Sequence, residues 1–395
     1  MPDFGGLPRS FWVLFIGTLV NRVGGFALAF IAIYLTDERG MTSAQAGAVL
    51  SVYGIAAIIG GPIGGALSDR IGRKPTLAAS LVAGGLSMLV VGFAAQPVAL
   101  VAAAAAAGLL YEMYRPVVTA TIADLVSPGD RPRAFNLIYW AINVGAAIAP
   151  AIGGWIAARS YRLLFAADGA TTMAYGLIVW LALTETRPSI ADQRDQGMGA
   201  VLRDRRFLAI CALTLLFSMV FFQAFAGLPL DLRANGISPK TIGWLFAING
   251  ALIIVIQPWA ASVLQRYSRA RALAAGAFIV GVGYAMNAGA ADWLPMRVAS
   301  IVVWTLGEIV FVPVSMTLAA DLAPAHLRGR YQGVFSMAYT SGFAVAPAVG
   351  GYVIGHFGAT VLWIGCLAAG GAIAAGFIAF GRAERRPAAA AAPSS

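Results

Sequence analysis

Charged residues stand inside several stretches of this sequence that are otherwise apolar. The segment 108–118 reads Gly-Leu-Leu-Tyr-Glu-Met-Tyr-Arg-Pro-Val-Val, which places Glu112 and Arg115 among apolar neighbours. Arg22 and Glu308 occupy similar positions in other apolar runs. A charge at the centre of a membrane-spanning helix costs about 2.5–3.5 kcal/mol on insertion scales, so it must be neutralised or face water. Such residues are typical of proton relays and of binding sites for charged solutes.

Glu112 and Arg115 are three residues apart, which on a helix is about 60° around the axis and about 4.5 Å along it. The two side chains can therefore touch. One interpretation is a self-neutralising pair that helps a helix to pack. The other is a polar cavity near the middle of the membrane, to which Arg22 and Glu308 also contribute.

The two acids are expected to differ in their chemistry. Arg115 favours the charged form of Glu112, which would then carry protons poorly near neutral pH. The sequence places no cationic residue three or four positions from Glu308, so burial would favour its neutral form and let it load and unload a proton. We therefore predict Glu308 as the better proton carrier. Glu112 is the second proton-coupling residue, and together with Arg22 and Arg115 it organises substrate and coupling.

The elements that must position these residues are membrane-spanning helices. Of 395 residues, 59% are hydrophobic and 11% are charged, whereas soluble domains carry roughly 25% charged residues. Twelve apolar runs are each long enough to cross a hydrocarbon core of about 30 Å. The runs are continuous and rich in Ala, Leu and Gly, unlike the alternating strands of a barrel, so an all-α membrane protein is predicted. The runs lie near 11–35, 44–67, 76–95, 98–122, 135–157, 163–183, 208–230, 241–264, 272–290, 296–320, 333–354 and 358–381.

The net charge of +10 is explained by topology and does not require a nucleic-acid partner. Nineteen Lys and Arg residues fall on the side of the N-terminus and six on the opposite side. The positive-inside rule then places both termini in the cytoplasm. The first apolar run is too long for the core of a cleavable signal peptide. Cys211 and Cys366 lie in apolar runs and are interpreted as packing residues.

The two halves of the sequence repeat each other. The hydrophilic segment 184–206 divides the runs six and six, and residues 116–125 align with 313–322 at a constant offset of 197. An even number of spans separates the copies, which indicates a parallel repeat about an axis along the membrane normal. Two six-helix bundles are predicted, 1–183 and 207–381, joined by a cytoplasmic linker at 184–206 and followed by a disordered tail at 382–395.

Duplicated halves of this kind suit alternating access, in which two bundles rock around a central site. A channel or a receptor has no comparable need for them. The sequence shows no metal-ligand spacing, no Ser/His/Asp set and no phosphate-binding glycine loop, so neither an enzyme nor a cofactor is predicted. A proton gradient would supply the energy.

A glycine-rich and basic motif joins the second and third runs. It reads Gly64-Gly-Ala-Leu-Ser-Asp-Arg-Ile-Gly-Arg-Lys74 and resembles the G-x-x-x-D-R-x-G-R-[KR] signature of the major facilitator superfamily. Its glycines permit close helix approach, and its charges can pair across a helix interface. The resemblance implies a cytoplasmic latch in which Arg73 pairs with Asp124 and Asp69 meets the start of the eleventh run. The latch residues are Gly64, Asp69, Arg70, Gly72, Arg73, Lys74 and Asp124. In the counterpart at 258–269 the Asp is missing.

A second motif lies in the fifth run, where residues 145–154 are similar to the antiporter motif of the same superfamily, with Ala149 in place of a glycine. This similarity favours export. The eleventh run repeats the pattern, so simple Gly/Pro packing explains it equally well. Over the whole chain, the sequence looks most like the twelve-span bacterial drug:proton antiporters, which implies the inner membrane and a monomer.

In that fold the first, fourth, seventh and tenth spans line a central cavity. The resemblance therefore implies a substrate cavity built from polar, charged and aromatic residues, most of them on these spans. The candidates are Asn21, Arg22, Tyr111, Glu112, Tyr114, Arg115, Asn143, Gln223, Trp304, Glu308 and Tyr339.

The leading hypothesis is proton-coupled efflux of drugs or other amphipathic small molecules. The alternative is proton-coupled uptake of a peptide, an amino acid or an organic anion. Exporters of cations commonly present an acid in the first span, whereas this chain has Asn21 and Arg22. Arg115-Pro116 and Glu308 distantly resemble positions of peptide symporters, but the E-x-x-E-R signature of that family is absent. A receptor or scaffold, the third possibility, would not require a latch together with charges in the cavity.

Overall fold

The computed structural model describes residues 6–127, 129–186, 198–264, 266–324 and 327–390. In these ranges the chain is helical and contains no β-strand. Twelve helices within them are long and apolar enough to cross a membrane. The predicted all-α fold with twelve spans is confirmed.

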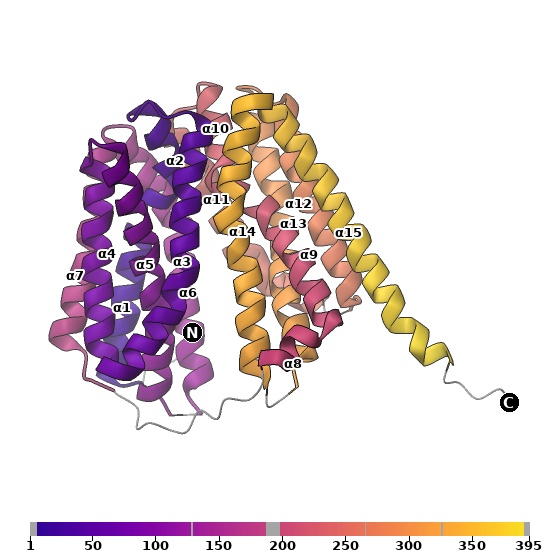
Figure 1. Cartoon of the computed structure of the whole chain (residues 1–395), viewed down its shortest axis with the longest axis horizontal. Helices are drawn as coiled ribbons and strands as arrows, with labels where there is room; N and C mark the ends of the chain where they lie inside the picture. The colour runs from indigo at the N-terminus through magenta and orange to yellow at the C-terminus, as the bar shows by residue number, and fades with distance from the viewer. Residues whose placement is uncertain (1–5, 128, 187–197, 265, 325–326, 391–395) are drawn as a thin grey trace. The chain divides into compact units, whose positions relative to one another are not determined.

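The chain divides into two compact units, which Figure 1 shows as bundles of long helices. Unit 1 comprises Met1–Arg194 and Ile237–Gly250, and unit 2 comprises Asp195–Gly236 and Ala251–Ser395. The sequence predicts that the whole eighth span belongs with the second bundle. The structure instead groups the first half of α11 (Pro239–Leu264) with unit 1, because Gly243 lies directly against α6.

In unit 1, α3 packs along α5, α4 packs along α7, and α1 contacts α6 and α7. Glycines make the first of these contacts possible. A Cβ atom at Gly64 would clash with the backbone carbonyl of Met113, and one at Gly108 with that of Tyr53. The helices of this unit are α1 (Arg9–Gly24), α2 (Ala27–Asp37), α3 (Ser43–Ile71), α4 (Arg73–Phe93), α5 (Pro97–Leu125), α6 (Arg131–Ala157) and α7 (Tyr161–Ala182).

The first span is not one continuous helix. The sequence predicts a single run at 11–35, but α1 ends at Gly24 and α2 begins at Ala27. A break inside a membrane leaves backbone groups that need partners within the protein. The N–H of Ala27 finds one in the carboxylate of Asp168 on α7, at 2.9 Å.

In unit 2, α12 packs against α13 and α15, and α14 packs against α9. The ring of Tyr284 stacks on Trp304 and on Trp363, with centroid distances of 5.7 and 5.6 Å. The helical segments are α8 (Met198–Arg203), α9 (Arg205–Phe221), η1 (Phe222–Phe225), α10 (Gly227–Ala234), α12 (Arg269–Ala285), η2 (Met286–Gly289), α13 (Leu294–Leu322), α14 (Arg328–Phe357) and α15 (Ala359–Ala390), together with the second half of α11.

The predicted linker and the predicted disordered tail are both partly helical. Helix α8 and the start of α9 fall inside the predicted linker at 184–206, and α15 continues through most of the predicted tail to Ala390. The tail is rich in alanine, which has the highest helix propensity, and this favours continuation of the helix. Residues 187–197 and 391–395 lie outside the described residues.

Candidate functional site

Glu112 and Arg115 form an ion pair on α5. The Nη1 atom of Arg115 lies 2.9 Å from Oε2 of Glu112. The Arg115 side chain is 57% exposed and that of Glu112 is 28% exposed. The pair predicted from their spacing therefore exists, and it lies away from the packed core of unit 1 with no net charge.

Arg22 on α1 is separate from that pair. Its guanidinium carbon lies 5.9 Å from the ring centroid of Tyr114, a cation–π geometry. Its Nε atom is buried and has no hydrogen-bond partner among the described residues. No ion pair of Arg22 is found within those residues either, so a half-buried positive charge remains on this helix.

A network of side-chain hydrogen bonds connects α1, α5 and α7. Asn21 donates from Nδ2 to Oγ1 of Thr172 at 2.8 Å, and the hydroxyl groups of Tyr111 and Thr172 lie 2.9 Å apart. Tyr111 also donates to Oδ1 of Asp168 at 2.5 Å. The structure thus brings the candidates Asn21 and Tyr111 together with two residues of α7.

The sequence reasoning missed Asp168. Its signal was available, because it is an acid within the apolar run at 163–183, the same criterion that singled out Glu112. The side chain is buried, with 2% of its residue surface exposed. The resemblance implies a cavity lined by the first, fourth, seventh and tenth spans, whereas α7 is the sixth span, so it does not indicate Asp168.

Two candidates in unit 2 belong to its packed core. Gln223 in η1 is buried and donates to the carbonyl oxygen of Ala346 on α14 at 2.9 Å. Trp304 is buried against Tyr284. For both residues, a place in a cavity wall stays a prediction.

The other candidates are more accessible. Glu308 on α13 is half-buried, one helical turn from Trp304. Tyr339 on α14 is also half-buried and lies 5.3 Å, centroid to centroid, from Phe222. Asn143 on α6 donates to the carbonyl of Tyr139 one turn earlier in the same helix.

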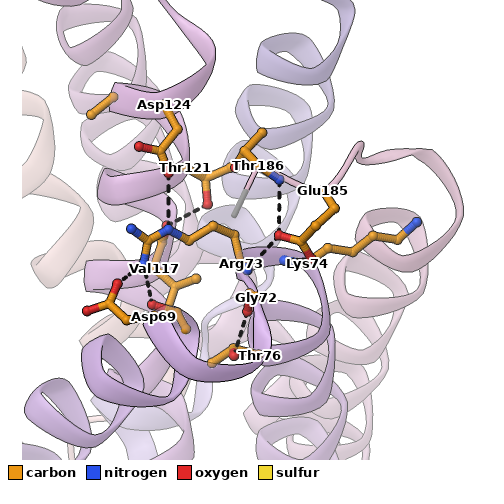
Figure 2. A network of polar contacts seen from close by, with 12 residues as sticks. Asp69, Gly72, Arg73, Lys74, Thr76, Val117, Thr121, Asp124, Glu185 and Thr186 are labelled. Carbon is orange, nitrogen blue, oxygen red and sulfur yellow. Dashed lines mark hydrogen bonds and ion pairs between the residues drawn. The ribbon is translucent and has the colours of Figure 1, made fainter. Parts of the chain in front are cut away.

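The predicted latch is assembled around Arg73, the first residue of α4 (Figure 2). Its Nε atom lies 3.1 Å from Oδ2 of Asp124, the partner that the resemblance implies. Its Nη1 atom lies 2.6 Å from Oδ1 of Asp69 and 2.6 Å from Oγ of Ser68. One buried guanidinium thus joins the ends of α3, α4 and α5.

Glu185 completes this network, and the sequence reasoning did not find it. Its carboxylate accepts the N–H of Arg73 at 2.8 Å and that of Lys74 at 3.3 Å, at the N-terminus of α4 (Figure 2). Carboxylates stabilise helix N-termini because they accept otherwise unpaired N–H groups and oppose the helix dipole. Gly72 adopts a φ of 112°, and a Cβ atom there would contact Glu185. The segment that follows α7 is therefore fixed to unit 1 at this residue, although the sequence assigns it to the linker.

Unit 2 preserves one part of the latch. Arg269, the first residue of α12, forms an ion pair with Asp321 near the end of α13. Asp321 is the repeat position of Asp124, at the offset of 197. The second-half motif has lost the residue equivalent to Asp69, yet the ion pair equivalent to Arg73–Asp124 remains.

Unit 2 also contains a fully buried ion pair. Arg297 on α13 is 1% exposed, and its Nη1 atom lies 2.6 Å from Oδ2 of Asp231 on α10. Trp363 donates to the same carboxylate oxygen at 3.0 Å. The Arg297 side chain therefore points into the bundle, where Asp231 holds it.

The described residues contain twelve apolar spans in two units with matching ion pairs. This defines a multi-pass membrane protein built from a duplicated bundle, an architecture typical of secondary transporters. The chain belongs to the Major Facilitator Superfamily, whose model matches residues 14–233 and 224–395. The sequence resemblance is thereby confirmed.

Curated relatives cover most of the chain. The MFS-type transporter YttB of Bacillus subtilis (strain 168) is 27% identical over 368 residues, which are 91% of this chain and 92% of YttB. Multidrug resistance protein MdtH of Klebsiella pneumoniae (strain 342) is 28% identical over 335 residues, 83% of each chain.

Solved structures share the fold. A POT family transporter in complex with 5-aminolevulinic acid matches with a TM-score of 0.80 at 16% identity, over 96% of this chain and 97% of that one. The nucleoside transporter NupG matches with a TM-score of 0.79 at 17% identity, over 94% and 99%. At these identities the likeness is one of fold.

Proposed function

We propose that this transporter is proton-coupled, works by alternating access, and exports drugs or other amphipathic small molecules. The observation that carries the proposal is the relationship to the MdtH proteins, named for multidrug resistance, over more than four-fifths of the chain. Acidic residues inside the spans, Glu112 on α5 and Glu308 on α13, support proton coupling.

The proposed location is the bacterial inner membrane, with both termini in the cytoplasm. The bacterial sources of the curated relatives support the membrane, and the distribution of Lys and Arg between the two sets of loops supports the orientation. In this orientation the network around Arg73 lies at the cytoplasmic ends of α3, α4 and α5, where it acts as the latch.

Glu308 is the proposed main proton carrier. It is half-buried on a span of unit 2, a position from which a carboxyl group can exchange protons with water. Glu112 is bound to Arg115, and a proton added to Glu112 would leave the positive charge of Arg115 without its partner. Glu112 therefore acts mainly as the partner of Arg115.

Purified protein in proteoliposomes with an imposed pH gradient tests this proposal. Ethidium serves as the amphipathic cation and dialanine as the zwitterionic solute. The proposal predicts that ethidium moves against the proton flux and releases protons from an acidified lumen. Movement of dialanine together with protons, without ethidium transport, would instead establish uptake.

Uptake of a peptide, an amino acid or an organic anion is the second candidate, and one observation favours it. Arg22 is half-buried and has no ion pair among the described residues, whereas Glu112 and Arg115 neutralise each other. A remaining positive charge attracts an anionic or zwitterionic solute. The Arg22→Gln variant discriminates the two candidates, because it would impair transport of dialanine far more than transport of ethidium.

A further inference from the structure

Asp168 is a buried acid that the proposed coupling through Glu308 does not use. Its Oδ2 atom accepts the backbone N–H of Ala27 at 2.9 Å, and its Oδ1 atom accepts the hydroxyl of Tyr111 at 2.5 Å. No ion pair to this side chain is found among the residues that the structure describes. Among the described residues, a negative charge on buried Asp168 is therefore balanced by hydrogen bonds alone.

The ionisable groups around Asp168 are mostly tyrosines. Tyr111 on α5 is bonded to it directly, and Tyr175 on α7 is bonded instead to Thr18, at 3.3 Å. Arg22 is the nearby cation contributed by α1, and it reaches Asp168 only through the network. On α2, α4 and α6 the charged residues are confined to the helix ends, and they are Asp37, Arg73, Lys74, Arg131 and Arg133. Tyr53 on α3 is a further buried tyrosine that is close enough to interact with the charge of Asp168.

A continuous chain of hydrogen bonds leads from Asp168 to Tyr114, which lies beside Arg22. Tyr111 connects Asp168 to Thr172, and Thr172 accepts from Nδ2 of Asn21. Tyr114 donates to Oδ1 of Asn21 at 3.4 Å. The ring of Tyr114 in turn lies next to Arg22.

The direction of this chain depends on the charge of Asp168. A carboxylate only accepts, so Tyr111 must donate to it, and the hydroxyl of Thr172 is then free to donate to Tyr111. A proton added to Oδ1 makes Asp168 a donor, so Tyr111 accepts from it and donates to Thr172. The hydroxyl of Thr172 then turns to a backbone carbonyl of the preceding turn, as threonines in helices commonly do. The only covalent change is the new O–H bond on Asp168.

We propose that Asp168 is a second proton-binding site of this transporter, located in unit 1, and that its protonation reverses the two hydrogen bonds of Tyr111, at the start of the chain that ends beside Arg22. Loss of the negative charge also strengthens the attraction of Arg22 for anionic groups and disfavours cations nearby. Binding of a proton and binding of a charged solute are thereby linked. The link to transport rests on the proposed proton-coupled function, whereas proton binding itself does not.

Infrared spectra of the purified protein test the site without any substrate. Protonated carboxyl groups give a carbonyl band that disappears on ionisation, and the spectrum is recorded as the pH is raised. We expect Asp168→Asn to remove one titrating component that the Glu308→Gln variant retains. Asparagine still offers an oxygen to the N–H of Ala27, so the break in the first span keeps its acceptor.

Tyr111→Phe is the second variant, and Tyr175→Phe is its matched control. Tyr111→Phe removes the hydroxyl that contacts Asp168, so the midpoint and frequency of the same component should shift. Tyr175→Phe removes a buried hydroxyl that contacts Thr18 instead, so it should leave that component unchanged. The site is refuted if the Asp168→Asn spectrum titrates like the wild type, or if the component never titrates. Failure of pH-driven transport in the wild type would refute the proposed function and leave the infrared result standing.

Discussion

The buried ion pair of unit 2 allows a prediction of stability. Asp231→Asn removes the negative charge and keeps the size of the side chain, so the guanidinium of Arg297 stays buried with neutral partners. These are the side-chain oxygen of Asn287 at 2.8 Å and the carbonyl of Ala291 at 2.7 Å. Breaking one half of a buried ion pair destabilises a protein by about 3–5 kcal/mol, because a charge remains without compensation. We expect a loss of this size in the free energy of unfolding.

Asp321→Asn is the matched control within the same unit. Its partner Arg269 is 46% exposed and Asp321 is 48% exposed, so the loss should be about 0.2–1 kcal/mol. Unfolding of both variants in mixed micelles, followed by tryptophan fluorescence, measures the difference. Replacing both buried partners by apolar residues, Arg297→Met with Asp231→Leu, should recover most of the lost stability. Equal losses in Asp231→Asn and Asp321→Asn would refute the reasoning.

Three further predictions concern the network that joins α3, α4 and α5. Gly64→Ala should lower the free energy of unfolding by about 1–3 kcal/mol, because the added methyl group meets the backbone of α5. Gly65→Ala, which has open space around it, should change it by no more than about 0.5 kcal/mol. Equal melting temperatures of the two variants would contradict this prediction. Asp124→Asn should slow transport several-fold, because it removes the ion pair with Arg73. The protein should still fold, because this pair is partly exposed and contributes little to stability. An unchanged initial rate of transport in proteoliposomes would contradict the latch. Glu185→Ala should lower the free energy of unfolding by about 1 kcal/mol, because the N-terminus of α4 loses its hydrogen-bond acceptors. Amide hydrogen exchange in the first turn of α4 should become faster. Unchanged protection of these amides would contradict the capping role of Glu185.

Apolar length was sufficient to predict the twelve spans found among the described residues, because lipid leaves the backbone few alternatives to helix. The break between Gly24 and Ala27 was not predictable from hydropathy, since Gly25 and Phe26 continue the apolar run. It depends on Asp168, a residue distant in sequence that supplies the missing acceptor. A hydrogen-bond acceptor that lies so far away in the sequence cannot be recognised from the residues around the break.

The candidate site shows the same limit. Spacing alone predicted the pair of Glu112 and Arg115, because residues three apart share a helix face. Spacing did not predict that Arg297 reaches Asp231, because that contact depends on how α10 and α13 pack. The capping role of Glu185 was likewise not predictable from the sequence, because it depends on the path that the chain takes after α7.

Proton-driven transport by the Glu308→Gln variant tests the central proposal most directly. Wild-type protein in proteoliposomes should accumulate ethidium only when a pH gradient is imposed. Glutamine cannot release a proton, so the variant should lose this gradient-driven accumulation and still exchange ethidium for ethidium at equal pH. Full accumulation by Glu308→Gln, driven by the gradient as in the wild type, would contradict the proposal.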